Sequence, residues 1–375
     1  MIISDVELRR IHLDLVKPFR TSFGEQTSRE ILLVGVTTAD GATGWGECVA
    51  MSEPLYSPEF VDAVELVIRD FLLPRLTGGA DVKAAEVAHL LEPIKGHQMA
   101  KAAVEMALLD AELRVANTNL HARLGGERTQ VPSGVSVGIF PTLDALLDAV
   151  QGYVDDGYAR IKLKIEPGWD LEPVRHVRDL IGPDMGLQVD ANTAYTRTDT
   201  EHLCALDEFD LLLIEQPLAT DDLLGHRDLA RAMSTPVCLD ESIESFAQAV
   251  DAVELGAAEI INIKPGRVGG YLNAVRIHDM CRDQGIPVWC GGMLETGIGR
   301  AANCALAALS GFTLPGDISA STRFYARDIV TDPISVHDGF VTVPQALGLG
   351  FDLDHDFLDS VTTSSHRLSA LDGRG

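Results

Sequence analysis

Charged residues end five consecutive apolar runs in the middle of the chain, and they recur at a nearly constant interval. Lys164, Asp190, Glu215, Asp240 and Lys264 stand 26, 25, 25 and 24 residues apart, with one more apolar residue after the first of them. Each interval has room for one strand, one helix and two loops, and strands that alternate with helices form a parallel sheet. The repeat therefore predicts an α/β domain with five charged side chains at one edge of its sheet.

The repeat extends beyond these five units. Apolar runs rich in Val and Ile occupy residues 135–139, 161–165, 187–190, 211–215, 237–240, 260–264 and 286–290, and residues 312–316 are a candidate eighth run. Eight runs favour closure into a βα barrel over an open sheet. The active sites of such barrels lie at the mouth where the C-terminal ends of the strands meet.

The chain on either side of the repeat is organised differently. Residues 31–36 and 43–50 flank Asp40-Gly41, a strong hairpin signal, and apolar residues at helical spacing follow at 59–73 and 98–116. Strands followed by helices without alternation indicate a separate α+β unit. The expected division is a capping domain at 1–125, a barrel at 126–320 and a C-terminal segment at 321–375 that packs back on the cap.

Charge and cysteine content exclude several classes of protein. The chain has 30 Lys and Arg against 56 Asp and Glu, a net charge of −26, so it lacks the basic surface that nucleic acid binding needs. No apolar run approaches the roughly 20 residues of a membrane helix, and charges within the first ten residues argue against a secretory signal. Six cysteines without C-x-x-C spacing indicate buried thiols in a reducing cytoplasm.

Three acids end adjacent strands of the predicted sheet, so that their side chains can converge on one point. Asp190, Glu215 and Asp240 would repel one another without a cation between them. An all-oxygen ligand set favours a hard ion, Mg²⁺ first, with Mn²⁺ or another divalent ion as alternatives. Cys238 is on the same side of its strand as Asp240, which leaves a thiolate ligand open but less favoured. Neutralisation by the lysines alone would leave more charge buried than it compensates.

The lysines are placed to act on either side of such an ion. Lys162 and Lys164 alternate with aliphatic residues, so both point away from the helices and into the barrel. Lys264 is four strands further on and approaches the mouth from the opposite side. A neighbouring ammonium and a metal ion lower the pKa of a lysine, which makes it a usable base. This arrangement is suited to removing a proton beside a carboxylate.

The motifs that carry these residues resemble the enolase superfamily, in its muconate-cycloisomerase-like subgroup. They are K-x-K at 162–164, V-D-A-N at 189–192, I-E-Q-P at 214–217, L-D-E-S at 239–242 and I-K-P-G-R-V-G-G at 263–270. The whole chain is similar to the o-succinylbenzoate synthase / N-succinylamino acid racemase family, through PFRTSFG at 18–24, GWGEC at 44–48, GVSVGI at 134–139 and CGGMLETGIGRAAN at 290–303.

The resemblance implies a fold, an activity and roles for individual residues. The fold is a modified (β/α)7β barrel with an N-terminal α+β capping domain that the C-terminal segment completes. The three acids would hold Mg²⁺ while an enediolate forms, with Lys164 as the base on one face and Lys264 on the other. Lys162 would help to bind the substrate carboxylate and lower the pKa of Lys164, and Arg267 resembles an arginine that tunes Lys264 in racemase-competent members.

The implied reactions are the dehydration that gives o-succinylbenzoate in menaquinone biosynthesis and the racemisation of N-succinylamino acids or other N-acylamino acids. We expect the partners to be a small-molecule carboxylate substrate and further copies of the chain, a homo-oligomer, and neither nucleic acid nor membrane. The expected substrate-binding residues include a mobile lid from the first domain and side chains around the barrel mouth: Phe19, Phe23, Met51, Tyr56, Ser136, Asn192, Gly292, Met293 and Phe324. Gly297-x-Gly299 opens a helix whose N–H groups could also bind a carboxylate.

Other functions remain open at this point. Muconate cycloisomerase shares the lysines and acids, and an amino-acid or dipeptide epimerase is a further alternative, although Asp317-Ile318-Ser319 lacks the D-x-D of dipeptide epimerases. A non-catalytic metal-binding barrel is a different class, and retention of both lysines argues against it. Residues 134–138 fit the G-x-S-x-G of serine hydrolases, but the pattern there predicts a strand that runs through Ser136, whereas the elbow needs a helix.

Overall fold

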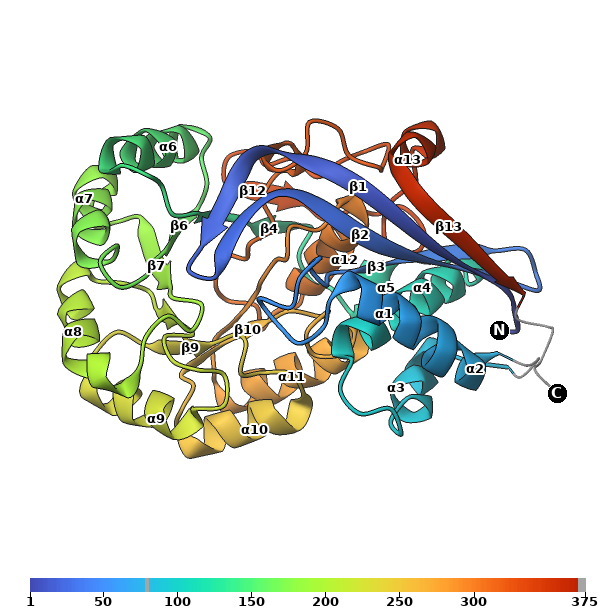
Figure 1. Cartoon of the computed structure of the whole chain (residues 1–375), viewed down its shortest axis with the longest axis horizontal. Helices are drawn as coiled ribbons and strands as arrows, with labels where there is room; N and C mark the ends of the chain where they lie inside the picture. Colours follow the sequence, from blue (N-terminus) through green and yellow to red (C-terminus); the bar gives the residue numbers. More distant parts are fainter. Residues whose placement is uncertain (78–80, 370–375) are drawn as a thin grey trace.

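The computed structural model describes residues 1–77 and 81–369. Within these ranges the chain forms a curled parallel sheet in the order β11-β10-β9-β8-β7-β6-β5 and a four-stranded antiparallel sheet in the order β13-β1-β2-β3. The antiparallel sheet lies across one side of the parallel one, and the N-terminus is at its far end (Figure 1). The predicted α/β barrel with an N-terminal cap is confirmed.

The parallel sheet follows the predicted repeat. Its strands are β5 (Gly134–Val137), β6 (Arg160–Lys164), β7 (Gly186–Asp190), β8 (Ile214–Glu215), β9 (Val237–Leu239), β10 (Ile260–Ile263) and β11 (Val288–Cys290). The helices after these strands are α6 (Leu143–Asp155), α7 (Leu171–Ile181), α8 (Thr200–Cys204), α9 (Leu223–Ala232), α10 (Phe246–Leu255), α11 (Tyr271–Gln284) and α12 (Gly297–Ala307). Figure 1 shows α6 to α11 as an arc around the outside of the sheet, which leaves the strand ends free to form a mouth.

Local signals in the sequence set the ends of these helices. The side chains of Thr142 and Ser245 cap the first turns of α6 and α10 by accepting backbone N–H groups. Gly256 and Gly285 end α10 and α11 in the left-handed conformation, which glycine adopts without a steric penalty. Each helix therefore stops where the chain must turn back into the next strand.

The eighth strand expected at 312–316 is not a regular strand. Phe312 makes one parallel bridge to Val288 of β11, and Gly316 makes one to Ser133, next to β5. Pro315 lies between them and has no N–H to donate, so a continuous ladder cannot form. The segment still joins the two edges of the parallel sheet, by single bridges.

The cap contains one predicted hairpin and one that the sequence did not predict. Its strands are β1 (Ile3–Thr21), β2 (Gly24–Thr38), β3 (Thr43–Cys48) and β13 (Thr362–Ser369). The turn at Asp40-Gly41 joins β2 to β3 as expected, whereas the longer hairpin of β1 and β2 was missed. That hairpin reaches from the cap to the parallel sheet (Figure 1), and β13 pairs antiparallel with β1.

Helices pack against this sheet and complete the cap. They are α1 (Val61–Val67), α2 (Leu73–Leu76), α3 (Val87–Leu90), α4 (Gln98–Val115) and α5 (Leu120–Leu124). Strand β3 approaches α4 so closely that a Cβ at Gly46 would lie 2.1 Å from the carbonyl oxygen of Ala103. Later in the chain, β4 (Gln130–Pro132) pairs with β12 (Phe340–Thr342), and α13 (His355–Val361) leads into β13.

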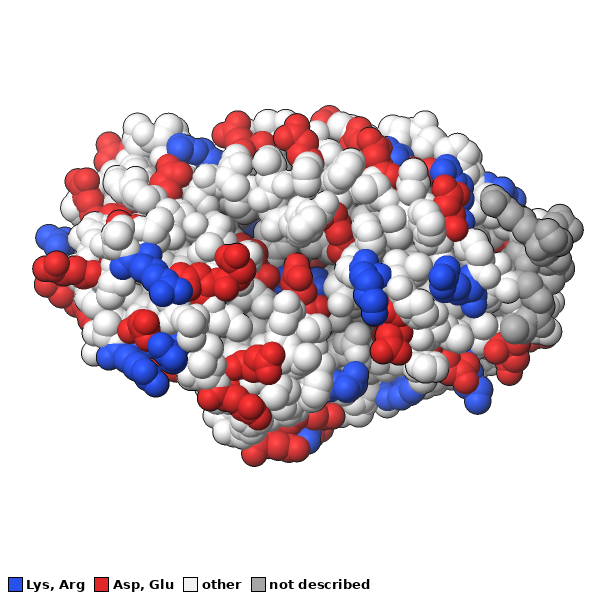
Figure 2. Space-filling view, turned by 60° about the horizontal axis from the view of Figure 1, so that its bottom comes forward, with Lys and Arg blue, Asp and Glu red and all other residues white. Residues whose placement is uncertain are grey.

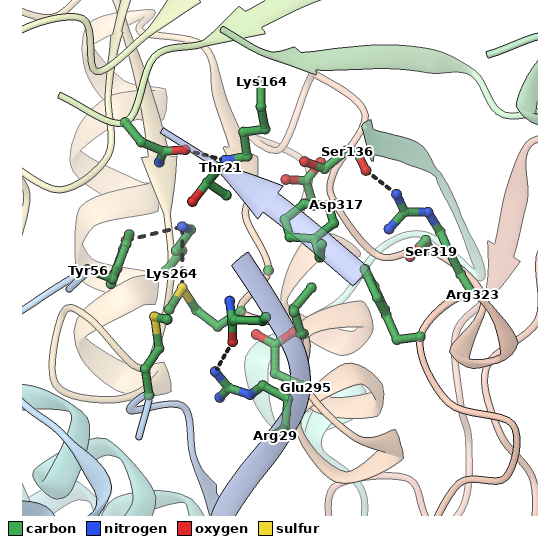
Figure 3. A pocket seen from close by; sticks show the side chains of 18 of the residues that line it. Thr21, Arg29, Tyr56, Ser136, Lys164, Lys264, Glu295, Asp317, Ser319 and Arg323 are labelled. Carbon is green, nitrogen blue, oxygen red and sulfur yellow. Dashed lines mark hydrogen bonds between the residues drawn. The ribbon is translucent and has the colours of Figure 1, made fainter. Parts of the chain in front are cut away.

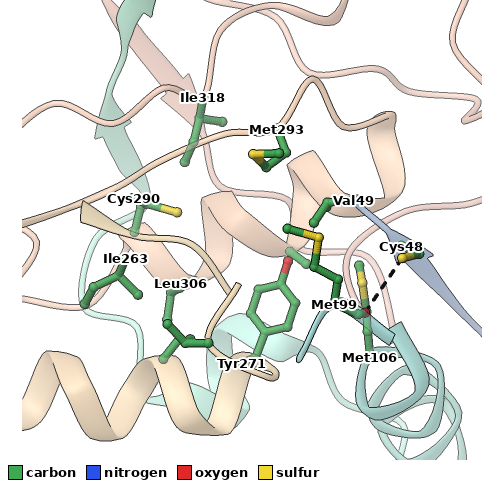
Figure 4. Packing of buried hydrophobic residues seen from close by; sticks show 14 of the residues in the cluster. Cys48, Val49, Met99, Met106, Ile263, Tyr271, Cys290, Met293, Leu306 and Ile318 are labelled. Atoms are coloured by element: carbon green, nitrogen blue, oxygen red, sulfur yellow. Dashed lines mark hydrogen bonds between the residues drawn. The ribbon is translucent and has the colours of Figure 1, made fainter. Parts of the chain in front are cut away.

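The cap and the barrel share one hydrophobic core. Figure 4 shows Met99 and Met106 of α4 beside Tyr271 of α11 and Leu306 of α12, all within one buried cluster. The Glu105 carboxylate, also on α4, accepts the N–H groups of Tyr271 and Leu272 at 2.7 and 3.0 Å. The start of a barrel helix is therefore held by a side chain of the cap.

The surface and the thiols agree with the composition. Lys and Arg form separate small groups among Asp and Glu on the face that Figure 2 shows. All six cysteines are free, and five of them are buried, with Cys204 half-buried. In the described part of the chain, no helix is long and apolar enough to span a membrane.

Candidate active site

Three buried acids stand at the C-terminal ends of adjacent strands. Asp190 and Glu215 end β7 and β8, Asp240 follows β9, and none of the three is more than 1% exposed. The backbone turns sharply after two of these strands, because Gln216 and Asn192 adopt left-handed φ values of 39° and 42°. The Gln216 side chain accepts the N–H of Asp240 at 3.0 Å. The turns that follow the strands therefore fix where the acids lie.

Lys162 lies among acids on the floor of the mouth. Its Nζ is 2.6 Å from Asp317, 3.0 Å from Glu215 and 3.2 Å from Asp190. Burial lowers the pKa of Lys162, but these three carboxylates outweigh burial, and the net shift is upward. These carboxylates therefore favour the charged ammonium form of Lys162.

Lys164 is in a different electrostatic setting, although it is on the same strand. Its Nζ donates to Asp190 at 2.5 Å and to Asn192 Oδ1 at 2.7 Å. Burial lowers the pKa of Lys164, Asp190 opposes this effect, and the nearby charge of Lys162 adds to it, so that the net shift is downward. The sequence predicted this direction from the neighbouring charge, whereas burial is the larger cause in the structure.

Lys264 is held by the cap as well as by the barrel. Its Nζ donates to Asp240 at 2.8 Å, to the Tyr56 hydroxyl at 3.1 Å and to the Met293 sulfur at 3.5 Å. Burial lowers the pKa of Lys264, but Tyr56, Glu215 and other nearby groups outweigh it and raise the pKa. The two lysines thus differ, with Lys164 biased toward the neutral amine and Lys264 toward the ammonium.

Arg267 contacts the acid that also holds Lys264. Its guanidinium forms an ion pair with Asp240 and donates to the carbonyl oxygens of Ile243 and Asn262, both at 2.6 Å. It also donates to the Tyr56 hydroxyl at 3.4 Å. Arg267 and Lys264 thus share Asp240 and Tyr56 as partners, which places their positive charges close together. The tuning of Lys264 by Arg267 stays a prediction.

The predicted metal ligands lie at one mouth, where each of them is paired with a cationic side chain. Asp190 is hydrogen-bonded to Lys164 and interacts with Glu215, and Asp240 is paired with Lys264 and Arg267. Among the described residues, no group of three His, Cys, Asp or Glu side chains is arranged to hold a metal ion. The donor chemistry fits a hard divalent cation, because all three groups are buried carboxylates. Their role as ligands stays a prediction.

The cap covers the mouth with a hairpin tip rather than a free loop. Phe19, expected in a mobile lid, is part of β1, and only Ser22 and Phe23 form the turn between β1 and β2. The Ser22 hydroxyl donates to the carbonyl oxygens of Ala191 and Asn192 at 3.1 and 3.3 Å. The Phe23 ring lies 6.3 Å from that of Tyr56. The tip is therefore docked on the strand end that carries Lys164's partner Asn192.

A cavity lies between the hairpin tip and the strand ends. The three lysines line it, and so do all nine residues expected to bind substrate: Phe19, Phe23, Met51, Tyr56, Ser136, Asn192, Gly292, Met293 and Phe324. Figure 3 shows Lys164, Lys264 and Tyr56 on one side of this hollow and Ser136, Ser319 and Arg323 on the other. The structure thus brings the predicted residues together, while their contacts with substrate remain a prediction.

Sequence reasoning missed several residues of the cavity wall. These are Thr21, Gln26, Arg29, Leu294, Glu295, Arg300, Asp317, Ser319 and Arg323. Asp317 directly follows the irregular eighth segment, and its ion pairs with Arg160 at 2.9 Å and with Lys162 join that segment to β6. No spacing in the sequence signals such a pairing. Arg323 lies in the segment that has no βα rhythm.

The expected anion site at Gly297-x-Gly299 is wrong. These glycines do begin α12, but the cap and a later loop already satisfy its N-terminal N–H groups. Glu47 of β3 accepts from Thr296 at 3.0 Å and from Gly299 at 3.0 Å, and Asp328 accepts from Gly297 at 2.9 Å. A substrate carboxylate would have to displace a protein carboxylate there.

Comparison with known proteins gives a consistent result over nearly the whole chain. Residues 5–125 match the N-terminal domain of mandelate racemase / muconate lactonizing enzyme, and residues 145–357 match the enolase C-terminal domain-like family. An N-succinylamino acid racemase from Amycolatopsis is 59% identical over 97% of this chain and 98% of its own length. An o-succinylbenzoate synthase from Geobacillus kaustophilus is 47% identical over 95% of both chains.

The fold comparison agrees. A crystal structure of an enolase superfamily member from Listeria innocua superimposes with a TM-score of 0.95 at 40% identity, over 99% of this chain and 100% of the other. The strand-end lysines and acids described above thus occur in a chain whose similarity to these enzymes spans both the cap and the barrel.

Proposed function

The chain belongs to the mandelate racemase / muconate lactonizing enzyme group of the enolase superfamily, and from this premise we propose that it removes a proton beside a carboxylate, as an o-succinylbenzoate synthase and as an N-succinylamino acid racemase. Members of this superfamily are enzymes that act on small molecules and use a divalent metal ion. Relatives with both names cover at least 95% of this chain, which supports both activities for one site.

One observation carries the proposal, the placement of two lysines with different surroundings on the wall of one cavity. Lys164 stands on β6 and Lys264 just beyond β10, with three strands between them, and both line the cavity. A substrate carbon between them would be open to proton transfer on either face. Two bases on opposite faces are what racemisation requires, because the proton leaves one side and returns on the other.

The proposed metal site consists of Asp190, Glu215 and Asp240. When bound there, Mg²⁺ would stabilise the negative charge that develops on the substrate carboxylate as the proton leaves. For the three acids to bind the ion, Lys164 and Lys264 must turn from them toward the substrate. Lys162 would remain paired with Asp317, which keeps a second positive charge beside the same carboxylate.

The chain's own residues divide the work in the two reactions. In the dehydration, Lys164 would take the proton and then give it to the departing hydroxyl group, which leaves as water, while the Lys264 ammonium would stabilise the developing charge. In the racemisation, Lys164 would take the proton from one enantiomer while Lys264 donates to the opposite face, and the roles reverse for the other enantiomer. The docked hairpin tip would exclude bulk water during both reactions.

Side-by-side kinetics test the proposal. We expect measurable kcat/KM in Mg²⁺ on succinyl-hydroxycyclohexadiene carboxylate and on N-succinylamino acids, and the ratio of the two values ranks the activities. Lys164→Ala should abolish both reactions, whereas Lys95→Ala, at an exposed lysine outside the cavity, should change neither. Retention of either reaction in Lys164→Ala would refute the assigned base. Turnover of muconate alone would replace the proposal with muconate cycloisomerase.

A further inference from the structure

The side of the cavity that faces the lysines carries an arginine that the reaction described above does not use. Arg323 ends a short helical turn, Ser321–Arg323, in the C-terminal segment. It is half-buried, lines the cavity, and donates through Nη2 to the backbone carbonyl of Ser136 on β5. Figure 3 shows this pair across the hollow from Lys264.

Aromatic rings hold the guanidinium of Arg323 in place. Its Cζ atom lies 4.6 Å from the ring centre of Phe324, 5.1 Å from that of Tyr153 and 5.8 Å from that of Phe19. Such contacts fix the plane of the group and attract its charge, but they accept none of its in-plane N–H bonds. The rings therefore orient Arg323 without neutralising it.

The donors of Arg323 are incompletely used. Its Nε and Nη1 atoms and the nearby Ser136 Oγ are buried without a hydrogen-bond partner among the described residues. The hydrogen-bond acceptor of Arg323 within the described chain is a neutral backbone carbonyl oxygen rather than an Asp or Glu carboxylate. A buried N–H donor without an acceptor costs free energy, and a bound anion would remove that cost.

The other arginines of the cavity wall also have an unpartnered Nε, but both of their terminal nitrogens have acceptors. Arg300 donates through Nη1 and Nη2 to the backbone carbonyl oxygens of Ser319 and Glu295, at 2.8 and 2.9 Å. Arg29 likewise uses both terminal nitrogens, at 3.2 and 3.1 Å. Arg323 is thus the arginine of this wall, within the described chain, that has a terminal nitrogen free for a ligand.

We propose that Arg323, with the Ser136 hydroxyl, binds a second carboxylate of the substrate, remote from the carbon that loses its proton. This inference rests on the proposed function, in which the lysine side takes the first carboxylate. Both relatives are named after compounds that carry a succinyl group, and a succinyl group ends in such a carboxylate. Arg323 therefore recognises what the two substrates share, so that one cavity serves two reactions.

The test compares two substrates that differ only in the remote carboxylate. N-succinylmethionine carries it, and N-butanoylmethionine has a methyl group in its place. We expect Arg323→Met to lower kcat/KM about 30-fold on the succinyl substrate, which is the usual effect of losing a hydrogen bond to a charged group. On the butanoyl substrate, the loss of kcat/KM should be smaller by a factor of at least about ten. Arg323→Lys should recover part of the loss because it restores the charge.

Matched controls separate recognition from folding. Arg327→Met removes another arginine of the same segment, which also stacks on a ring but is exposed and paired with Asp354, and it should leave both substrates unaffected. If Arg323→Met does not fold, Ser136→Ala provides the second variant, with a smaller loss confined to the succinyl substrate. Equal losses on both substrates, or no loss on either, would overturn the assignment.

Failure of the proposed function gives a different result. Wild-type protein that turns over neither compound would contradict the proposed reaction and leave the anion site to be judged by binding. Calorimetric titration should then show tighter binding of N-succinylmethionine than of N-butanoylmethionine, and Arg323→Met should remove that difference. Equal binding of the two compounds by wild type would overturn the anion site.

Discussion

Tyr56 contacts one of the two catalytic lysines proposed here and not the other. Its hydroxyl lies 3.1 Å from Lys264 Nζ and 3.2 and 3.3 Å from the two oxygens of Asp240. Lys164 is held instead by Asp190 and Asn192. Tyr56→Phe removes the hydroxyl and keeps the ring, which lies 4.7 Å from Lys264 Nζ. The change should therefore affect proton transfer on the face of Lys264.

The size of the effect follows from these contacts. The hydroxyl has one proton, so it donates to Asp240 and accepts from Lys264, and both partners are charged. A hydrogen bond to a charged group contributes about 2 kcal/mol, which corresponds to about 30-fold in rate. We expect exchange at Lys264 to fall by about that factor, exchange at Lys164 to fall less than about threefold, and dehydration to resemble exchange at Lys164.

Deuterium exchange resolves the two faces. Each enantiomer of N-succinylmethionine is incubated separately in D₂O with Mg²⁺, and early loss of the α-proton signal is followed by NMR. The enantiomer that still exchanges in Lys164→Ala identifies the face of Lys264. Tyr56→Phe should slow that enantiomer selectively while thermal unfolding stays unchanged. Equal slowing of both enantiomers would refute a positioning role for Tyr56.

Three other perturbations address the fold and the metal. Gly46→Ala should lower the free energy of unfolding by at least about 1–3 kcal/mol, because its Cβ would lie 2.1 Å from the Ala103 carbonyl oxygen. Gly152→Ala, in a helix with open space around it, should cost nothing, and equal denaturation midpoints for the two variants would contradict the packing argument. Burial raises the pKa of Glu105 from 4.5 to about 7, so the folded protein keeps a proton that the unfolded chain loses, and stability falls as the pH rises between those values. Glu105→Gln should remove that part of the slope in thermal unfolding, and a difference from wild type that is independent of pH would be inconsistent with it. A chelator in excess should stop proton exchange at both lysines and Mg²⁺ should restore it, whereas full activity in chelator would rule out the proposed metal site.

The periodic part of the protein could be predicted from its sequence. The interval of about 25 residues located the strands from β6 to β10, and alternation within 161–165 placed Lys162 and Lys164 on the inner face, where both are buried. These predictions succeeded because strand period and helix length are local properties of the backbone. The segment at 312–316 departed from the repeat where Pro315 interrupts the ladder.

The contacts across the cavity could not be predicted in the same way. Tyr56 meets Lys264 across 208 positions, and Arg323 meets Ser136 across 187. The tip of the β1–β2 hairpin docks on the end of β7, although no pattern in residues 18–24 indicates a partner. Such pairs depend on how the cap sits on the barrel, which the shared core around Met106 and Tyr271 decides.

The sequence alone determined the order of strands and helices, the mouth of the barrel, and the acids and lysines that gather there, because each of these follows from residues close together along the chain. Only the tertiary structure decided which lysine is held by the cap, which carboxylates are paired with cationic side chains, and which arginine has unpartnered N–H donors. Those properties depend on burial and on the distances between charges, and both are set by segments that meet only when the chain has folded.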